Sequence, residues 1–146
     1  MDLDVQVEGL AELQKQLQRL ERATAGKVLR AGARDAMKPV IQEVAQNVPI
    51  DSAQLIESLK LSSTVGEGGY AASGGIRIRP KTAPHWHLVE YGTQARTHAN
   101  GKSTGAMPAK PVFRPAFDKH RRNVVERFKA YLAKRIGKEL KKAGLK

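Results

Sequence analysis

The sequence has 146 residues, no cysteine and a formal net charge of +12. This length suits one ordinary domain, and 40% apolar with only 5% aromatic residues indicates an aliphatic core. The composition excludes disulfides, thiol catalysis and cysteine metal sites. No apolar run reaches the ~18 residues of a membrane span, and the acidic start does not fit a secretory signal.

The charge is divided unevenly along the chain. Residues 1–75 hold 8 Lys and Arg against 10 Asp and Glu, a net of −2, whereas residues 76–146 hold 18 against 4, a net of +14. The two values sum to the +12 of the whole chain. A basic half indicates either a surface that contacts a polyanion or a strongly charged face turned to water, and both interpretations stay open here.

Periodicity in the first third of the chain predicts a strand and two helices. Apolar and polar residues alternate over residues 2–7, which predicts a short strand. Leucines at helical spacing predict a helix over residues 10–23. Thr24 is placed to cap a second helix over residues 25–47, and Pro39 inside it predicts a kink because it removes one hydrogen bond.

The middle of the chain predicts a short helix followed by a hairpin or meander. A break at the preceding proline is followed by a helical segment over residues 53–58. Alternation predicts strands over residues 59–65 and 76–79, the second with both isoleucines on one face and both arginines on the other. The glycines at 66–69 and at 74–75 predict two turns.

A stretch from His85 to Asp118 holds the only tryptophan, and five of the six other aromatic residues lie in it or just beyond it. A short helix is expected over residues 85–91, with Gly92 as a left-handed C-cap. The segment Gln94 to Ala106 has no Leu, Ile, Val or Phe, so it cannot pack a core. Two anchored ends with a polar loop between them indicate a surface element that is presented to a partner.

The candidate chemical groups in this stretch do not form a catalytic or metal site. Glu90 is the only acid between Glu67 and Asp118, and a lone glutamate among arginines favours an ion-pair partner that orients a loop over a catalytic carboxylate. His85 and His87 diverge on a helix, and no third ligand lies at metal spacing. The sequence predicts no enzyme, no metal and no cofactor.

The C-terminal segment predicts a long basic amphipathic helix that opens at Pro115 and covers residues 116–143. Its apolar stripe could pack on the domain and turn the charge to water or nucleic acid, lie on an anionic membrane, or bind a partner helix. The first role is favoured because phenylalanines at helical spacing are more often core residues, and no membrane partner is expected.

The predicted fold class is α+β. It has two N-terminal helices, a small antiparallel β-sheet with a long hairpin, and the long C-terminal basic amphipathic helix. We expect one domain over residues 1–146, with 1–58 mainly helical, 59–115 forming the β-sheet with long loops, and 116–146 forming the terminal helix. The basic tail of that helix, residues 138–146, is expected to fray.

Four motifs in this order resemble one family. They are Val7-x-Gly9-Leu10, Pro49-x-Asp51-x-x-x-Leu55-x-x-Ser58, Glu90-Tyr91-Gly92-Thr93 and Pro111-x-x-Arg114-Pro115-Ala116-Phe117. The family is the bacteriophage HK-ninety-seven gene-product-ten-like one, small neck or tail-completion proteins of long-tailed phages. The chain departs from it at Ser52-Ala53, where members have a glycine. If that glycine supports a left-handed turn, Ala53 would adopt it at a cost of about 1 kcal/mol.

The resemblance implies a structural virion protein, made in the bacterial cytoplasm, that acts by binding at the head–tail junction. Such proteins form a ring, commonly a hexamer, between the connector and the tail-tube proteins. The alternative function is a sequence-independent nucleic-acid-binding protein. The candidate contacts with other subunits and partners are Trp86, Glu90, Tyr91, Gly92, Arg96, Phe113 and Arg114. Candidates that face packaged double-stranded DNA, without sequence preference, are Arg77, Arg79, Lys102, Arg121 and Arg122, with Arg96 able to join them.

Overall fold

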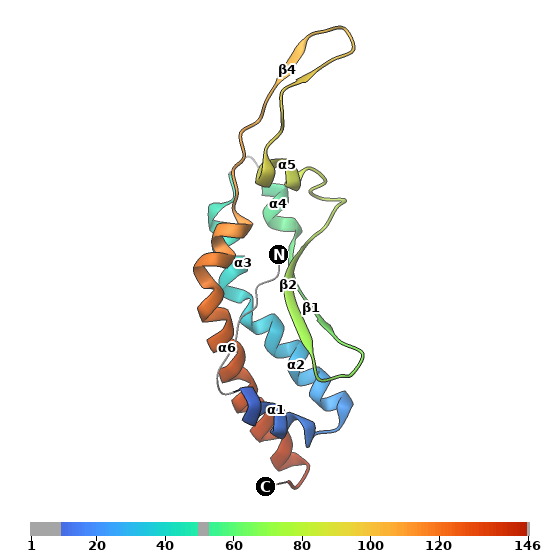
Figure 1. Cartoon of the computed structure of the whole chain (residues 1–146), viewed down its shortest axis with the longest axis vertical. Coiled ribbons are helices and arrows are strands. Elements are labelled where there is room, and N and C mark those ends of the chain that lie inside the picture. The colour runs from blue at the N-terminus through green and yellow to red at the C-terminus, as the bar shows by residue number, and fades with distance from the viewer. Residues whose placement is uncertain (1–9, 50–52, 146) are drawn as a thin grey trace. The chain divides into compact units, whose positions relative to one another are not determined.

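The computed structural model describes residues 10–49 and 53–145, and the chain divides into two compact units (Figure 1). The first unit comprises the described residues of Met1–Pro39 together with Leu61–Gly75 and Arg121–Lys146. The second comprises those of Val40–Lys60 together with Ile76–His120. The α+β class is confirmed. The strand expected over residues 2–7 lies outside the described residues, and the single-domain organisation stays a prediction.

The core of the first unit is built by α1 (Leu10–Gln18), α2 (Arg22–Ala36) and the later turns of α6 (Phe113–Lys142). Aliphatic side chains with at most 7% exposure form this cluster, which confirms the apolar stripe expected on the last helix. Ile136 has no exposed surface at all. The cluster consists of Leu17, Leu20, Ala25, Val28, Leu29, Leu132, Ile136 and Leu140.

The first helix is shorter than the sequence predicts. α1 ends at Gln18 and α2 begins at Arg22, so Thr24 lies inside α2 and does not cap it. The turn between them is closed by the N–H of Leu20, which donates to the carbonyl of Leu17 at 3.1 Å. Turning the chain here buries both leucines in the same cluster, and this burial overrides the propensity to continue the helix.

Pro39 has a larger effect than the expected kink. α2 ends at Ala36 and a separate helix, α3 (Lys38–Asn47), begins two residues later. Pro39 is therefore the second residue of a new helix, where the N–H that it lacks has no intrahelical partner in any case. The prediction of one continuous, kinked helix over residues 25–47 is wrong for this reason.

A two-stranded sheet follows the short helix α4 (Ala53–Ser58). The bounds of α4 and of β1 (Leu59–Val65) confirm the predictions, and Ala53 opens α4 without the positive φ that a left-handed turn would require. β2 (Ala72–Ile78) is longer than expected because Gly74 and the glycine after it lie inside the strand. A Cβ on Gly74 would lie 2.6 Å from the carbonyl oxygen of Ala33, so a close approach to α2, not a turn, requires this glycine.

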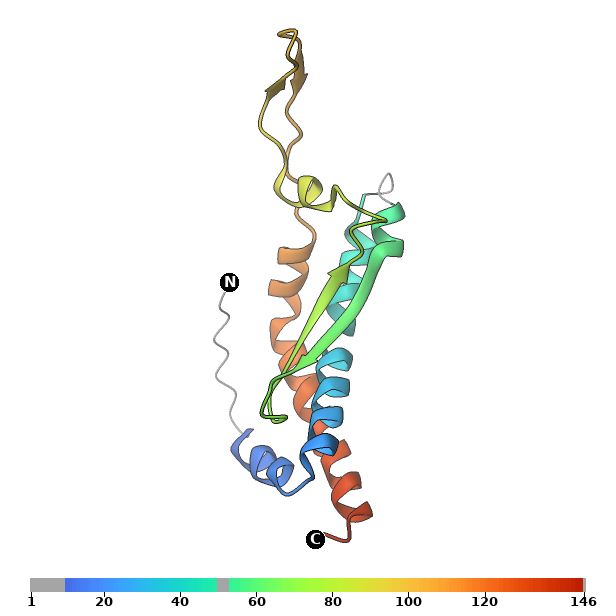
Figure 2. The ribbon, with the colours of Figure 1, turned by 90° about the vertical axis from the view of Figure 1, so that its right-hand side faces the viewer.

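The second unit contains α5 (Trp86–Tyr91) and the hairpin of β3 (Arg96–Thr97) and β4 (Ser103–Gly105). The expected polar loop is thus partly ordered as two antiparallel strands that project beyond α5 (Figure 2). α6 begins at Phe113, three residues before the predicted start, and Pro115 is its third residue. Proline is tolerated there because the N–H groups of a helix's first turn have no intrahelical partner.

The end of α6 is closed by a glycine. Gly144 has φ +71°, and the N–H of Leu145 donates to the carbonyl of Leu140 at 2.9 Å. Fraying of the tail stays a prediction. Within residues 10–49 and 53–145, none of the helices has both the length and the apolar character needed to cross a bilayer.

Within the second unit, Glu43 of α3 joins the first turns of α6. Its carboxylate accepts hydrogen bonds from Lys119 Nζ at 2.8 Å and, in the tautomer or protonated form that carries the proton there, from His120 Nε2 at 3.2 Å. Asn47 Nδ2 donates to it from the next turn of α3 at 3.1 Å. These donors, that of Lys119 first, lower the pKa of Glu43 from 4.5 to about 2.

Replacing Glu43 by Gln is expected to weaken the acid sensitivity of folding. A carboxylate whose pKa is lower in the folded state contributes stability above about pH 4.5 and loses it as the pH falls toward about 2. In urea titrations across this window, the Glu43→Gln chain should lose less stability than the wild type. Glu67→Gln is the control because Glu67 has no ion-pair partner among the described residues. Equal pH profiles for wild type and Glu43→Gln would contradict the expectation.

Candidate functional site

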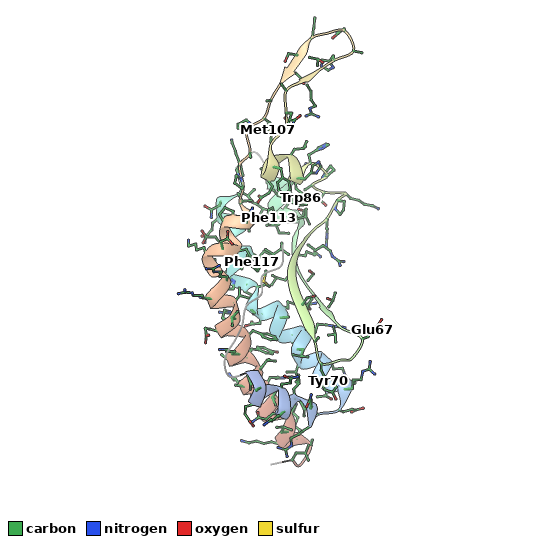
Figure 3. All side chains as sticks on the ribbon, in the orientation of Figure 1. Glu67, Tyr70, Trp86, Met107, Phe113 and Phe117 are labelled. Carbon is green, nitrogen blue, oxygen red and sulfur yellow. The ribbon has the colours of Figure 1, made fainter. Side chains whose placement is uncertain are left out.

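The candidate site is the base of the β3–β4 hairpin, where α5 meets the start of α6. Trp86 and Phe113 pack edge to face, with ring centroids 5.6 Å apart and planes at 72° (Figure 3). Such aromatic pairs contribute roughly 0.5–1.5 kcal/mol beyond the burial of their area. The contact holds two segments that are far apart in the sequence on the two sides of the hairpin.

Glu90 is buried at this base, with 5% exposure, and caps α6. Its Oε2 accepts hydrogen bonds from the N–H of Val112 at 2.7 Å and of Phe113 at 3.2 Å, and its Oε1 accepts one from the N–H of Arg114 at 3.2 Å. These amides at the helix start have no intrahelical acceptor, and the helix dipole favours a negative charge there. The prediction of an ion pair with an arginine side chain is wrong, because the partners are peptide N–H groups.

A second set of hydrogen bonds closes the hairpin beside Glu90. The N–H of Thr93 donates to the carbonyl of Met107 at 2.8 Å, and the N–H of Met107 donates to Thr93 Oγ1 at 3.0 Å. The N–H of Lys110 donates to the carbonyl of Val89 at 2.8 Å. The sequence analysis missed this pairing, because polar loops carry no pattern that reveals which backbone groups meet.

Gly92 ends α5 with φ +70° and ψ −174°, and its N–H donates to the carbonyl of Leu88. The predicted cap is confirmed as a positive-φ glycine, although its ψ is extended and not that of a left-handed helix. This combination of angles is accessible almost only to glycine. A Cβ on Gly92 would lie 2.7 Å from both the carbonyl oxygen of Met107 and the nitrogen of Ala109, so the two sides of the hairpin approach each other closely here.

The hairpin beyond this base is exposed along its whole length, from Gln94 to Pro111. Its turn is closed by the N–H of Gly101, which donates to the carbonyl of His98 at 2.9 Å. Arg96 and Lys102 supply cations, and no acid occurs between Glu90 and Asp118. A rigid base that carries an exposed cationic hairpin is suited to binding a partner.

Two exposed side chains flank the base. Tyr91 is 75% exposed at the end of α5. Met107, on the other arm of the hairpin, is 38% exposed and is labelled in Figure 3. Glu90 is buried, whereas the next residue, Tyr91, turns its ring to solvent at the end of α5. Aromatic residues and methionine are enriched in the cores of protein interfaces, which makes this pair suitable for anchoring a protein partner.

The structure brings most of the candidate contact residues together, whereas the candidate DNA-facing ones are divided between the two units. Trp86, Phe113, Glu90 and the backbone of Arg114 meet at the base, with Gly92 beside them. The DNA-facing candidates are all exposed and have no ion-pair partner among the described residues. Arg77, Arg79 and Lys102 belong to the second unit, whereas Arg121 and Arg122 belong to the first.

No group of three or more His, Asp or Glu side chains that could hold a metal ion occurs within the described ranges. The groups that the site offers to a partner are hydrogen-bonding, cationic and aromatic. The buried carboxylate of Glu90 already accepts hydrogen bonds from three backbone N–H groups.

Comparison with known protein families gives a match over more than half of the chain. A family model described as "Bacteriophage HK97-gp10, putative tail-component" matches residues 11–92. The matched segment runs from α1 through α5 and includes three residues of the base, Trp86, Glu90 and Gly92. No curated protein and no solved structure gave a match.

Proposed function

The chain belongs to the HK97-gp10-like family of bacteriophage tail components, and from this membership we propose that it is a structural virion protein that forms a ring at the head–tail junction. In this role it joins the connector to the tail tube, as a neck, tail-completion or tail-terminator protein. It works by binding and has no enzymatic activity.

The observation that carries the proposal is the anchored, exposed hairpin. The base is fixed by three hydrogen bonds that backbone N–H groups donate to Glu90 and by the Thr93–Met107 pair, whereas no described residue from Gln94 to Pro111 is buried. A chain gains little by fixing an unburied segment so firmly unless the segment meets another molecule. Contacts of Trp86, Tyr91, Arg96 and their neighbours with other subunits and with partner proteins would give the fixed segment this role.

The uneven division of charge along the sequence supports ring formation. The hairpin and α6 are cationic, whereas residues 1–75 have a net charge of −2. Regions of like charge repel each other, so charge favours a contact between unlike regions of successive copies and selects their orientation, but it contributes less to the affinity of that contact. Such head-to-tail contacts close into a ring when their rotation permits it.

One specific observation favours the second candidate, sequence-independent binding of nucleic acid. Arg77, Arg79 and Lys102 of the second unit, and Arg121 and Arg122 of the first, are exposed and have no ion-pair partner among the described residues. Cations that lack protein partners are available for phosphate groups. In a ring, some of them would face the DNA that passes through the centre. The strand arginines could equally pair with acids of a neighbouring subunit.

Light scattering on the purified protein separates the two functions. We expect a discrete oligomer of about six subunits that persists at high salt without nucleic acid. A monomer that binds any duplex DNA and releases it with a slope of about −0.9 in log K per log salt for each phosphate contact would favour the second function. Electron microscopy of virions then locates the protein, and its absence from the head–tail junction would contradict the proposal.

A further inference from the structure

The β3–β4 hairpin has backbone edges that no other described strand covers. β3 pairs with β4 in a sheet of only two strands, and the flanking residues are all exposed. A two-stranded hairpin is marginally stable in water, and an unpaired strand edge is a template for a further strand. The hairpin therefore has hydrogen-bonding groups available for a strand of another molecule.

The two edges are not equivalent. Arg96 lies opposite Gly105 and Thr97 lies opposite Ser103, so Thr104 is an extra residue that forms a bulge in β4. Gly105 also has φ +72°. Bulges twist a strand and disrupt its ladder, which makes the β4 edge a poor template. The β3 edge has no extra residue and can accept a regular strand.

Thr97 presents its backbone groups on the outer side of β3. The neighbouring N–H of His98 points inward, because it donates to the carbonyl of Lys102 across the hairpin at 2.8 Å. Successive residues of an antiparallel strand direct their N–H and C=O groups to opposite sides. The N–H and the carbonyl of Thr97 therefore face away from β4.

The side chains around the β3 edge indicate what kind of strand can bind there. Arg96, Lys102 and Lys110 are exposed, and the sequence has no acid from Tyr91 to Phe117. Apart from Met107, the arms of the hairpin have no large apolar side chain, so main-chain hydrogen bonds must supply much of the affinity. Exposed Tyr91 at the base offers an aromatic anchor. A strand with acidic side chains can pair with the cations, bond to the main-chain groups and pack on Tyr91, whereas DNA would use the cations alone.

We propose that the β3 edge binds an acidic β-strand of a neighbouring virion protein by strand addition. The N–H of Thr97 donates to the added strand, Arg96 and Lys102 pair with its carboxylates, and Tyr91 packs against its end. This inference rests on the proposed function, since it takes the partner from the virion. It goes further by naming the edge, the binding mode and the chemistry of the partner.

The test is photo-crosslinking in assembled virions that carry the full chain with Ala95→p-benzoylphenylalanine. Three versions are compared: wild type at position 97, Thr97→Pro and Thr97→Val. Proline removes the outward N–H and is tolerated on an edge whose N–H is not used within the hairpin. Valine keeps the N–H and removes only the hydroxyl. We expect a cross-link to an acidic, extended segment of a virion protein, reduced about tenfold by Thr97→Pro and less than about twofold by Thr97→Val.

Retention of the hairpin in the Thr97→Pro chain is checked by exchange protection of the His98 amide. A second variant, Arg96→Glu with Lys102→Glu, leaves the backbone intact and should also lower the cross-link about tenfold. Equal yields in the charge-reversed chain and the wild type, or cross-links to DNA, would overturn the proposal. The absence of any cross-link from the hairpin, in virions that contain the protein, also overturns the strand-addition proposal but does not contradict the proposed function. A chain absent from virions contradicts the proposed function itself.

Discussion

Glu90→Ala is expected to destabilise the protein by about 3–4 kcal/mol, a large part of the 5–15 kcal/mol that typically holds a domain folded. The substitution removes the acceptor of three amides, those of Val112, Phe113 and Arg114. An unsatisfied buried donor costs roughly 1–3 kcal/mol, and the two partly buried amides recover part of this by bonding water. Urea denaturation measures the change as a lower midpoint at an unchanged slope.

Glu90→Gln tests how much of the stabilisation comes from the charge of the side chain, because glutamine has nearly the same shape. The glutamine side chain keeps one oxygen, which can accept from the backbone N–H groups of Val112 and Phe113. Its NH₂ group then faces the N–H of Arg114, so two donors meet there. We expect a loss of roughly 1–2 kcal/mol. Asp118→Ala is the matched control, because Asp118 is an exposed acid on the same helix and should change stability by less than about 0.5 kcal/mol. If Glu90→Ala behaved like this control, Glu90 would not be the group that fixes the start of α6.

Gly92→Ala is the second substitution with a large expected effect, about 2–4 kcal/mol. An alanine must adopt φ +70° and place its Cβ 2.7 Å from two backbone atoms, neither of which can rotate away. The arms of the hairpin would have to separate, which would stretch the hydrogen bond between Thr93 and Met107. Thermal unfolding gives the stability change, and exchange of the Thr93 amide reports whether the base has opened.

Substitutions at two other glycines distinguish backbone strain from steric overlap as the cause of the destabilisation at Gly92. Gly101 has φ +78° but open space where a Cβ would lie, so Gly101→Ala should cost only the backbone strain, about 1 kcal/mol. Gly68 has neither a positive φ nor a close neighbour, so Gly68→Ala should stay within about 0.5 kcal/mol. The expected order of destabilisation is Gly92, then Gly101, then Gly68. Equal effects at Gly92 and Gly101 would mean that the close approach of the two arms contributes nothing.

The sequence predicts the elements whose pattern is local. The strand β1 and the helix α4 follow directly from alternation and from the break at the preceding proline, and the apolar stripe of α6 matches the buried residues Leu132, Ile136 and Leu140. Gly92 is recognisable because a glycine after a short apolar helix commonly has a positive φ. These features need no knowledge of what lies on the other side of the fold.

The features that the sequence does not predict depend on tertiary contacts. Gly74 has the pattern of a turn residue, yet it lies in a strand because α2 leaves no room for a side chain there. Pro115 marks the start of α6 only to within one turn, since proline fits any of the first helical positions. The partners of Glu90 lie 22–24 residues away, and they are backbone amides, which every sequence contains.

The closed base has a consequence for how this protein can change over time. Thr93 and Met107 are hydrogen-bonded to each other, and Glu90 fixes the start of α6. The segment between Thr93 and Met107 contributes no residue to the described core. The entropy of closing a loop rises slowly, by about 0.6 kcal/mol for each doubling of its length. Insertions, deletions or a wholly different sequence between positions 94 and 106 are therefore inexpensive for folding. The segment from Gln94 to Ala106 can therefore change in sequence and length while the scaffold beneath it stays the same.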